Sequence, residues 1–253
     1  MIPKTIHWCW FGHGKASALI DRCVESWKRH CPGYAIKVWD EGSFDVGSVR
    51  FVKEAYQMKK WAFVSDYVRL YALYTEGGVY LDSDVEVLRP IDRFLSCPAF
   101  TGFEMPGFCL TGIMGSEKGG AWVGEMLKEY DNRSFILDGG KLNLDPNLSY
   151  ATKIMKAKGV DFSGHHISIP GYVDIYPRDF FCPKRHEDGK IVLTDNTYVI
   201  HHFAGSWLSP SKKFAKWAGQ HTTPLVEYYI NYFCRNPAIV AHDLLGFAKR
   251  HLG

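Results

Sequence analysis

The chain has 253 residues, of which 46% are hydrophobic and 23% are charged, so it can bury a sizeable core, and disordered, collagenous and coiled-coil architectures are excluded. Thirty basic and 27 acidic residues leave a net charge of +3, which is too small and too evenly spread to indicate a nucleic-acid partner. The seven cysteines contain no C-x-x-C pair, so we expect reduced thiols instead of a disulfide framework or a zinc ribbon.

The first forty residues predict a β-α-β unit. Residues 2–11 are apolar and aromatic and end at Gly12, which is typical of a buried strand that runs into a turn. From Ser17 onward apolar side chains recur at helical spacing, and residues 34–40 alternate like a half-buried strand. Such units build parallel sheets, so the sequence predicts an α/β fold with a Rossmann-like sheet.

The N-terminal segment has no long apolar core of the kind found in signal peptides, and no stretch approaches the roughly 18 apolar residues of a spanning helix. We therefore expect a cytoplasmic protein.

Two helices are predicted next, over residues 49–60 and 61–76, and Gly77 and Gly78 end the second. Residues 79–81 form a short apolar strand that delivers Asp82 and Asp84 at its carboxyl end, the edge at which open α/β sheets bind ligands. Further along the chain we expect strands over 99–104, 109–115 and 197–203, helices over 121–130 and 148–158, and a helical, aromatic tail from residue 223.

Asp82 and Asp84 flank a serine and have no neighbouring lysine or arginine to neutralise them, so the pair favours a cation. Oxygen ligands suit Mg²⁺ or Mn²⁺, although the same pair could simply cap a turn in water. Asp66 and Arg69 are three residues apart on one face of the preceding helix. They form either a structural ion pair or a site for the hydroxyl groups of a polar ligand.

These residues carry a family resemblance. The pattern S-D-x-x-R at residues 65–69, followed by L-Y-x-x-G-G-x-Y-x-D-x-D at residues 73–84, resembles the signature of the DXD sugar-transferase family, glycosyltransferase family 32. Residues 2–12 resemble the first strand of that family, and residues 201–207 resemble its closing motif. The family includes bacterial capsule and exopolysaccharide transferases and yeast initiating mannosyltransferases.

The resemblance implies a GT-A fold, a Rossmann-like nucleotide-binding sheet with flanking helices, over residues 1–217, with residues 218–253 as a helical extension. It implies a metal-dependent retaining hexosyltransferase in polysaccharide biosynthesis that moves a sugar from a nucleotide-diphosphate sugar, with a UDP-sugar favoured. The acceptor would be a glycan or a lipid-linked saccharide, and no nucleic acid takes part.

The resemblance also assigns roles to individual residues. Asp82, Asp84 and His202 would hold the Mn²⁺ or Mg²⁺, because His202, three residues before Gly205, resembles the histidine that completes the metal sphere in a related retaining family. Neighbouring strand residues point to opposite faces, so only one of His201 and His202 is expected to be a ligand. The donor would be bound by the remaining site residues, which are Trp10 against the base, Asp66 and Arg69 at the sugar or ribose, Tyr80, and Ser206 and Trp207 over the phosphates.

Two further functions compete with this interpretation. A haloacid-dehalogenase-type phosphotransferase also begins with an apolar strand and D-x-D, and would use Asp82 as nucleophile, but it would want Thr or Val where Glu86 stands. A non-catalytic sugar- or nucleotide-binding protein of the same fold is the other alternative. The family's sugar pocket favours an asparagine near Thr111, so its absence leaves the donor sugar open.

The tail interleaves apolar and aromatic residues with Arg235, Lys249, Arg250 and His251. This pattern suits a helical cap on the domain, which we favour, or an interfacial helix that makes peripheral contact with the inner face of the membrane near a lipid-linked acceptor.

Overall fold

The computed structural model describes residues 1–185 and 188–205, and the chain divides into two compact units. The unit that comprises Met1–Lys184 and Val192–Phe203 contains all the elements considered below. The predicted boundary at residue 217 and the predicted helical extension lie outside the described residues. Within the described residues, no helix combines the length and the apolar character that crossing a membrane would require.

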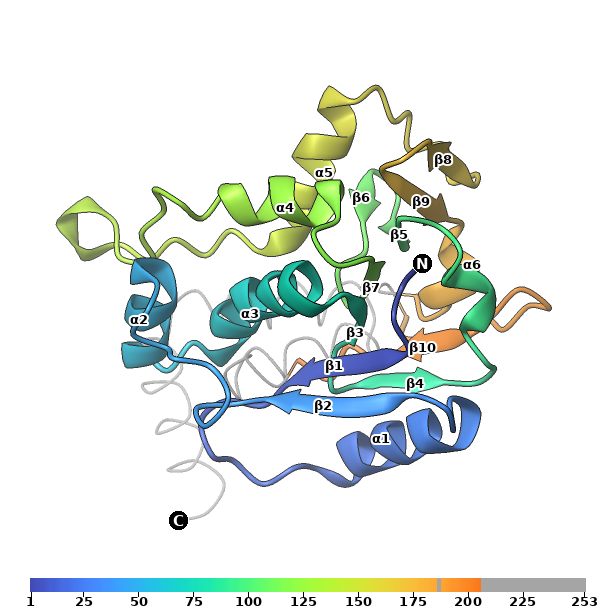
Figure 1. Cartoon of the computed structure of the whole chain (residues 1–253), viewed down its shortest axis with the longest axis horizontal. Helices are drawn as coiled ribbons and strands as arrows, with labels where there is room; N and C mark the ends of the chain where they lie inside the picture. The colour runs from blue at the N-terminus through green and yellow to red at the C-terminus, as the bar shows by residue number, and fades with distance from the viewer. Residues whose placement is uncertain (186–187, 206–253) are drawn as a thin grey trace, which may run out of the picture. The chain divides into compact units, whose positions relative to one another are not determined.

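The unit is built on one large mixed sheet, with strand order β2-β1-β3-β7-β5-β9-β8 and β6 paired to β5 (Figure 1). Strands β1, β2 and β3 run parallel, whereas β7 is antiparallel to both β3 and β5. A separate two-stranded sheet pairs β10 with β4. The strands of the unit are β1 (Thr5–Cys9), β2 (Ala35–Trp39), β3 (Gly78–Leu81), β4 (Val85–Val87), β5 (Ala99–Met105), β6 (Phe108–Cys109), β7 (Ile113–Ser116), β8 (Ile167–Ile169), β9 (Val173–Tyr176) and β10 (Val199–His201). The helices are α1 (Ala18–His30), α2 (Arg50–Gln57), α3 (Trp61–Glu76), α4 (Ala121–Lys128), α5 (Asn147–Ala157) and α6 (Arg178–Phe181).

The predicted β-α-β unit is confirmed. β1 pairs with β2 in parallel, and α1 connects them after Ser17, whose side chain accepts a hydrogen bond from the Ile20 N–H as an N-cap. The buried side of α1 includes Trp27, whose Nε1 donates to the Val85 carbonyl at 2.7 Å. This bond ties α1 to the first residue of β4.

The strand β3 separates two buried clusters because its side chains alternate between the two faces of the sheet. Val79 and Leu81 belong to the cluster that includes α1, and Tyr80 belongs to the cluster that includes α2 and α3. Figure 1 shows α1 and α3 on opposite sides of β1 and β2. The sheet is thus covered by helices on both faces, as the predicted α/β class requires.

The turn from α3 into β3 depends on two glycines. Gly77 closes α3 through its N–H to the Leu73 carbonyl at 2.9 Å, and it has a φ of 72°. Gly78 has a φ of 120°, and a Cβ there would lie 2.6 Å from the Thr5 carbonyl oxygen of β1. Only glycine fits this close approach, which fixes where β3 begins and hence where it delivers its carboxyl end.

Some elements differ from the prediction. The strand expected over residues 109–115 is split into β6 and β7, and the register between β5 and β6 shifts between Phe103 and Met105. The sequence did not predict β4, β8, β9 or α6, each of which has only three or four residues, so a periodic pattern is hard to recognise in them.

We expect Gly78→Ala to lower the free energy of unfolding by about 1–3 kcal/mol, since the new Cβ must displace backbone of β1 and alanine disfavours this φ. Gly33→Ala is the matched control, because a Cβ there meets nothing within 4 Å. Urea unfolding followed by circular dichroism measures both changes. An equal effect of the two substitutions would show that the close approach to β1 does not constrain the turn.

Candidate metal centre and donor site

Two aspartates meet in the tight connection between β3 and β4. Asp82 follows β3 directly, and its N–H donates to the Gly112 carbonyl at 2.8 Å. Its own carbonyl accepts from the Val85 N–H at 2.9 Å, so the chain turns at once into β4. Asp84 occupies this turn, and the two carboxylates therefore come from the carboxyl end of a buried strand, as the sequence predicts.

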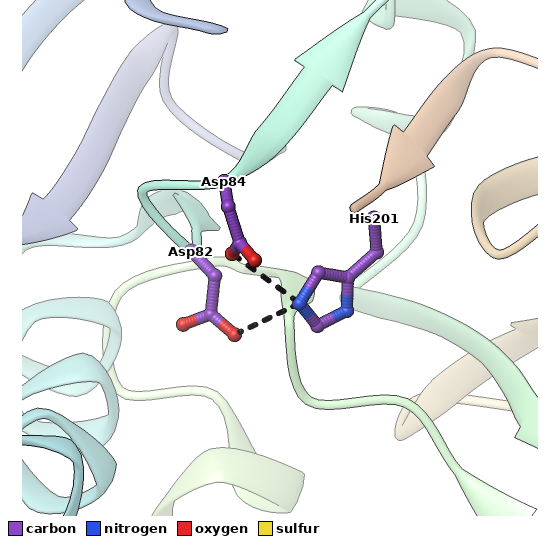
Figure 2. A group of neighbouring side chains, drawn as sticks. All are labelled: Asp82, Asp84 and His201. Atoms are coloured by element: carbon purple, nitrogen blue, oxygen red, sulfur yellow. Dashed lines mark ion pairs between the residues drawn. The ribbon is translucent and has the colours of Figure 1, made fainter. Parts of the chain in front are cut away.

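A histidine from the far end of the described chain completes the group. β10 pairs antiparallel with β4, and His201 lies opposite Val85 in the register. The His201 Nε2 is 3.4 Å from Asp84 Oδ1 and 3.8 Å from Asp82 Oδ2 (Figure 2). One ligand atom from each of the three side chains lies within 4.8 Å of the others, and the three point toward a common centre.

The structure corrects the predicted third ligand. The sequence favoured His202, but the Nε2 of His202 is 2.7 Å from Glu86 Oε2 and points away from the pair. The alternation of neighbouring strand residues was the right principle. His201, and not His202, lies on the face that meets the aspartates, because this is set by the register of β10 against β4, which cannot be derived from local sequence.

The group suits a divalent cation. The side chains of Asp82, Asp84 and His201 are 23%, 14% and 11% exposed, so carboxylate charge is gathered where little water can screen it. The Nδ1 of His201 is buried and has no hydrogen-bond partner within the described residues. Two carboxylates and one imidazole form a donor set that Mn²⁺ accepts well, and Mg²⁺ accepts through the oxygens.

The pKa shifts of His201 and Asp82 also indicate that the group favours positive charge. Burial opposes the charged form of His201, but the carboxylates of Asp84 and Asp82 outweigh burial and raise the pKa of His201 above its usual value. Burial also raises the pKa of Asp82, although Arg69 and His201 partly offset it. Without a cation, the group therefore depends on the positive charges around it.

Arg69 connects Asp66 to the group formed by Asp82, Asp84 and His201. Its Nη2 is 2.9 Å from Asp66 Oδ1 and 3.2 Å from Asp82 Oδ1, and its Nη1 donates to the Thr111 carbonyl at 2.6 Å. The guanidinium also lies over the Tyr80 ring, 4.7 Å from its centroid. Asp66 and Arg69 thus form a buried ion pair that extends to Asp82, Asp84 and His201, which we call the metal group.

Tyr80 differs from its predicted role. The sequence grouped it with the donor-binding residues, but Tyr80 is 1% exposed and its hydroxyl donates to Asp82 Oδ1 at 2.9 Å. It therefore acts on any ligand through the position of Asp82.

Two further residues at the site had no signal in the sequence. The Asn147 N–H donates to Asp66 Oδ2 at 3.2 Å, and its side-chain amide donates to the Asp66 carbonyl at 2.5 Å. A Cβ at Gly112 would lie 2.7 Å from the His201 ring and 3.1 Å from Asp82 Oδ2, so glycine is needed there to seat the histidine. Both residues are far from the motif along the chain, and only the fold brings them to it.

The remaining predicted residues are placed as follows. Trp10 is half-buried just beyond β1, where its Nε1 donates to the Gly14 carbonyl at 2.8 Å, and its ring lies 6.1 Å from that of Trp8. Its stacking on a base stays a prediction. Ser206 and Trp207 lie outside the described residues.

Comparison with known families decides what kind of motif this is. Residues 17–101 match the model described as the glycosyltransferase sugar-binding region containing the DXD motif. This region belongs to the DXD sugar-transferase family. It runs from the N-cap of α1 into β5 and includes Asp66, Arg69, Asp82 and Asp84.

Among curated proteins, the chain is similar to inositol phosphoceramide mannosyltransferase 3 of Schizosaccharomyces pombe, with 27% identity over 142 residues. The alignment covers 53% of this chain and 38% of the relative, so the chain spans well under half of that protein.

Two solved structures are similar at 17% identity. The PaToxG glycosyltransferase has a TM-score of 0.46, with 63% of this chain and 72% of that one covered. A glycosyltransferase involved in the glycosylation of the major capsid of PBCV-1 has a TM-score of 0.46, with 81% and 95% covered. The assignment of the family depends on residues 17–101 and not on these distant likenesses.

We expect His201→Ala to weaken Mn²⁺ binding by about 10–100-fold, the usual effect of a lost or misplaced ligand interaction, while His202→Ala leaves it nearly unchanged. Calorimetric titration of Mn²⁺ into each purified variant measures this. Equal losses in the two variants would contradict the placement of His201 as the third ligand.

Proposed function

We propose that this protein is a metal-dependent glycosyltransferase that moves a sugar from a nucleotide-diphosphate sugar to a glycan or lipid-linked saccharide. The convergence of Asp82, Asp84 and His201 carries the proposal, because the two aspartates lie in the region that matches the DXD family and the fold adds His201 to them. Polysaccharide biosynthesis, such as capsule formation, is the setting we propose.

Asp82, Asp84 and His201 would hold Mn²⁺ or Mg²⁺, which would supply Lewis-acid compensation for the charge of the diphosphate leaving group. The residues around the group fix its geometry in advance. Tyr80 and Arg69 both engage Asp82 Oδ1, so the Oδ2 is turned toward His201. Such preorganisation avoids the free energy of rearrangement during the reaction.

The donor would lie against the same edge of the sheet. Trp10 offers an aromatic face beyond β1 for the base, with uridine favoured, and Asp66 and Arg69 stand beside the metal group for ribose or sugar hydroxyls. Ser206 and Trp207 would close over the phosphates. A mannosyl donor belongs in any test, because the similar S. pombe protein is named as a mannosyltransferase.

Retention of the anomeric configuration is the mechanism we propose. An inverting transferase needs a base on the face opposite the leaving group. Asp82 and Asp84 are directed at the metal group, and both carboxylate oxygens of Asp66 have partners, in Arg69 and Asn147. If the acceptor attacks from the side of the leaving group, the diphosphate oxygen itself can take the acceptor proton. No protein base is then required.

The geometry disfavours phosphoryl transfer by Asp82. A nucleophilic carboxylate needs an oxygen open to the incoming phosphorus, whereas one oxygen of Asp82 is shared by Tyr80 and Arg69 and the other faces His201. A non-catalytic sugar-binding protein of the same fold is separated from the enzyme by a nucleotide-sugar hydrolysis assay. A cytoplasmic location, with the tail near a membrane-bound acceptor, remains part of the proposal.

We expect Asp84→Asn to lower the rate of transfer by at least about a hundredfold while the protein stays folded, because it removes one charged ligand. Asp92→Asn is the control, since Asp92 is an exposed carboxylate paired with Lys4 and is not part of the Asp82, Asp84 and His201 group. The assay follows nucleotide-diphosphate release from UDP- and GDP-sugars with Mn²⁺. Full activity of Asp84→Asn would remove the metal group from the mechanism.

The product is expected to keep the α configuration of an α-linked donor. Nuclear magnetic resonance of freshly formed product gives the anomeric coupling constant, which distinguishes the two outcomes for sugars with an axial hydrogen at C2. A β-linked product would mean that another acid, such as Glu104, serves as base.

A further inference from the structure

A polar pocket lies at the N-terminus of α2, and Asp82, Asp84 and His201 are not among the residues that line it. It has a volume of about 410 Å³ and joins the N-terminus of α2 to the segment that follows α4. We call it the α2 pocket. Its lining residues are Ser48, Val49, Arg50, Tyr67, Tyr130, Asp131, Asn132, Arg133 and Ser134. Figure 1 shows the chain after α4 passing beside α2, where Glu54 Oε2 accepts the N–H groups of Phe135 and Ile136.

Arg133 contributes a guanidinium group to the lining of the α2 pocket. Its guanidinium packs against three aromatic rings, at 4.0 Å from the Tyr150 centroid, 4.6 Å from Phe51 and 5.0 Å from Tyr130. Its Nη2 donates to Asn143 Oδ1 and to the Asp145 carbonyl, but its buried Nε and Nη1 have no hydrogen-bond partner among the described residues. No carboxylate of the described part forms an ion pair with it. The positive charge is therefore held in place without a carboxylate at ion-pair distance among the described residues.

The N-terminus of α2 adds to the positive charge at the α2 pocket. Val49, the N-cap, provides no side-chain hydrogen bond, so the N–H groups of the first turn lack the usual cap. A helix N-terminus carries partial positive charge and favours anions. Arg50 also lines the pocket, but its charge is compensated by Glu54 at 2.8 Å. Asp131 opposes an anion, yet it is exposed at the pocket, where water screens it.

The pocket is linked to the proposed active site by a short chain of contacts. The Tyr130 hydroxyl donates to Asn147 Oδ1 at 2.5 Å, and the Asn147 N–H donates to Asp66 Oδ2 at 3.2 Å. Asp66 then reaches Asp82 through Arg69. Tyr130 therefore borders the α2 pocket and supports the donor site at once.

We propose that the α2 pocket binds the anionic group of an acceptor, a carboxylate or a phosphate on a saccharide, through Arg133 and the N-terminus of α2. The identification of the ligand as an acceptor rests on the proposed function, whereas the anion site is argued from the pocket alone. A saccharide with an acidic group would present its charge to Arg133 and its hydroxyls to Asn132 and Ser134.

The test measures binding, without turnover, by heteronuclear magnetic resonance of the full chain with glucuronate, glucose 1-phosphate, inorganic phosphate and neutral methyl glucoside as probes. The three anions are expected to shift the amide signals of residues 49–51 and the Arg133 Nε–H signal, and methyl glucoside is not. Tighter binding of glucuronate would identify a sugar acid, and tighter binding of glucose 1-phosphate a sugar phosphate. Inorganic phosphate binding as well as either would show that the anionic group alone is recognised.

Variants that make the charge of the α2 pocket more negative or more positive are expected to change anion affinity in opposite directions. Arg133→Gln should weaken anion binding about tenfold, since it removes a charged donor, and Asp131→Asn should strengthen it about threefold. Ser48→Glu, at an exposed position beside the helix start, should weaken binding without loss of fold, because an acid there is favourable to the helix. Arg93→Gln is the matched control, as Arg93 also packs on aromatic rings but bonds to the Tyr198 hydroxyl.

If neutral and anionic probes bind alike, or if neither Ser48→Glu nor Asp131→Asn changes anion affinity, the proposal is wrong. This failure is distinct from failure of the proposed function, because hydrolysis of a nucleotide sugar by the wild-type chain is measured separately and does not involve Arg133.

Discussion

The buried guanidinium of Arg69 is the interaction on which the site depends. It binds two carboxylates and a backbone carbonyl at once, and it stacks on the ring of Tyr80. A buried charge of this kind is tolerated only when its donors are met and opposite charge lies close. Asp66 and Asp82 supply that charge, so the helix α3, the end of β3 and the loop before β7 are held in one arrangement.

This arrangement explains the orientation of the metal group. Because Arg69 and Tyr80 both take the Oδ1 of Asp82, the other oxygen is directed to His201 without further adjustment. The cluster of negative charge that a cation would neutralise is thus present in the folded chain. The same network continues from Asp66 through Asn147 to Tyr130, where it borders the α2 pocket. Donor and acceptor sides of the proposed reaction would share one scaffold of polar contacts.

The small antiparallel sheet has a role out of proportion to its size. β4 has only three residues, yet it receives α1 through the Trp27 bond and β10 through backbone pairing. It therefore brings His201, from near the end of the described chain, to a motif that lies in its first half. The absence of a side chain at Gly112 leaves room for the imidazole.

The sequence by itself determined the β-α-β start, the helices α2 and α3 with their glycine end, and the delivery of Asp82 and Asp84 at a strand edge. Each of these depends on short-range periodicity or on residue types in fixed spacing, which local sequence records directly. It also paired Asp66 with Arg69, because residues three apart share a helix face.

Tertiary structure alone decided which histidine joins the aspartates and that Asn147 and Gly112 belong to the site. These depend on strand register and on contacts between segments far apart in the chain. A shift of one residue in the pairing of β10 with β4 would exchange His201 for His202, and no local pattern carries that information.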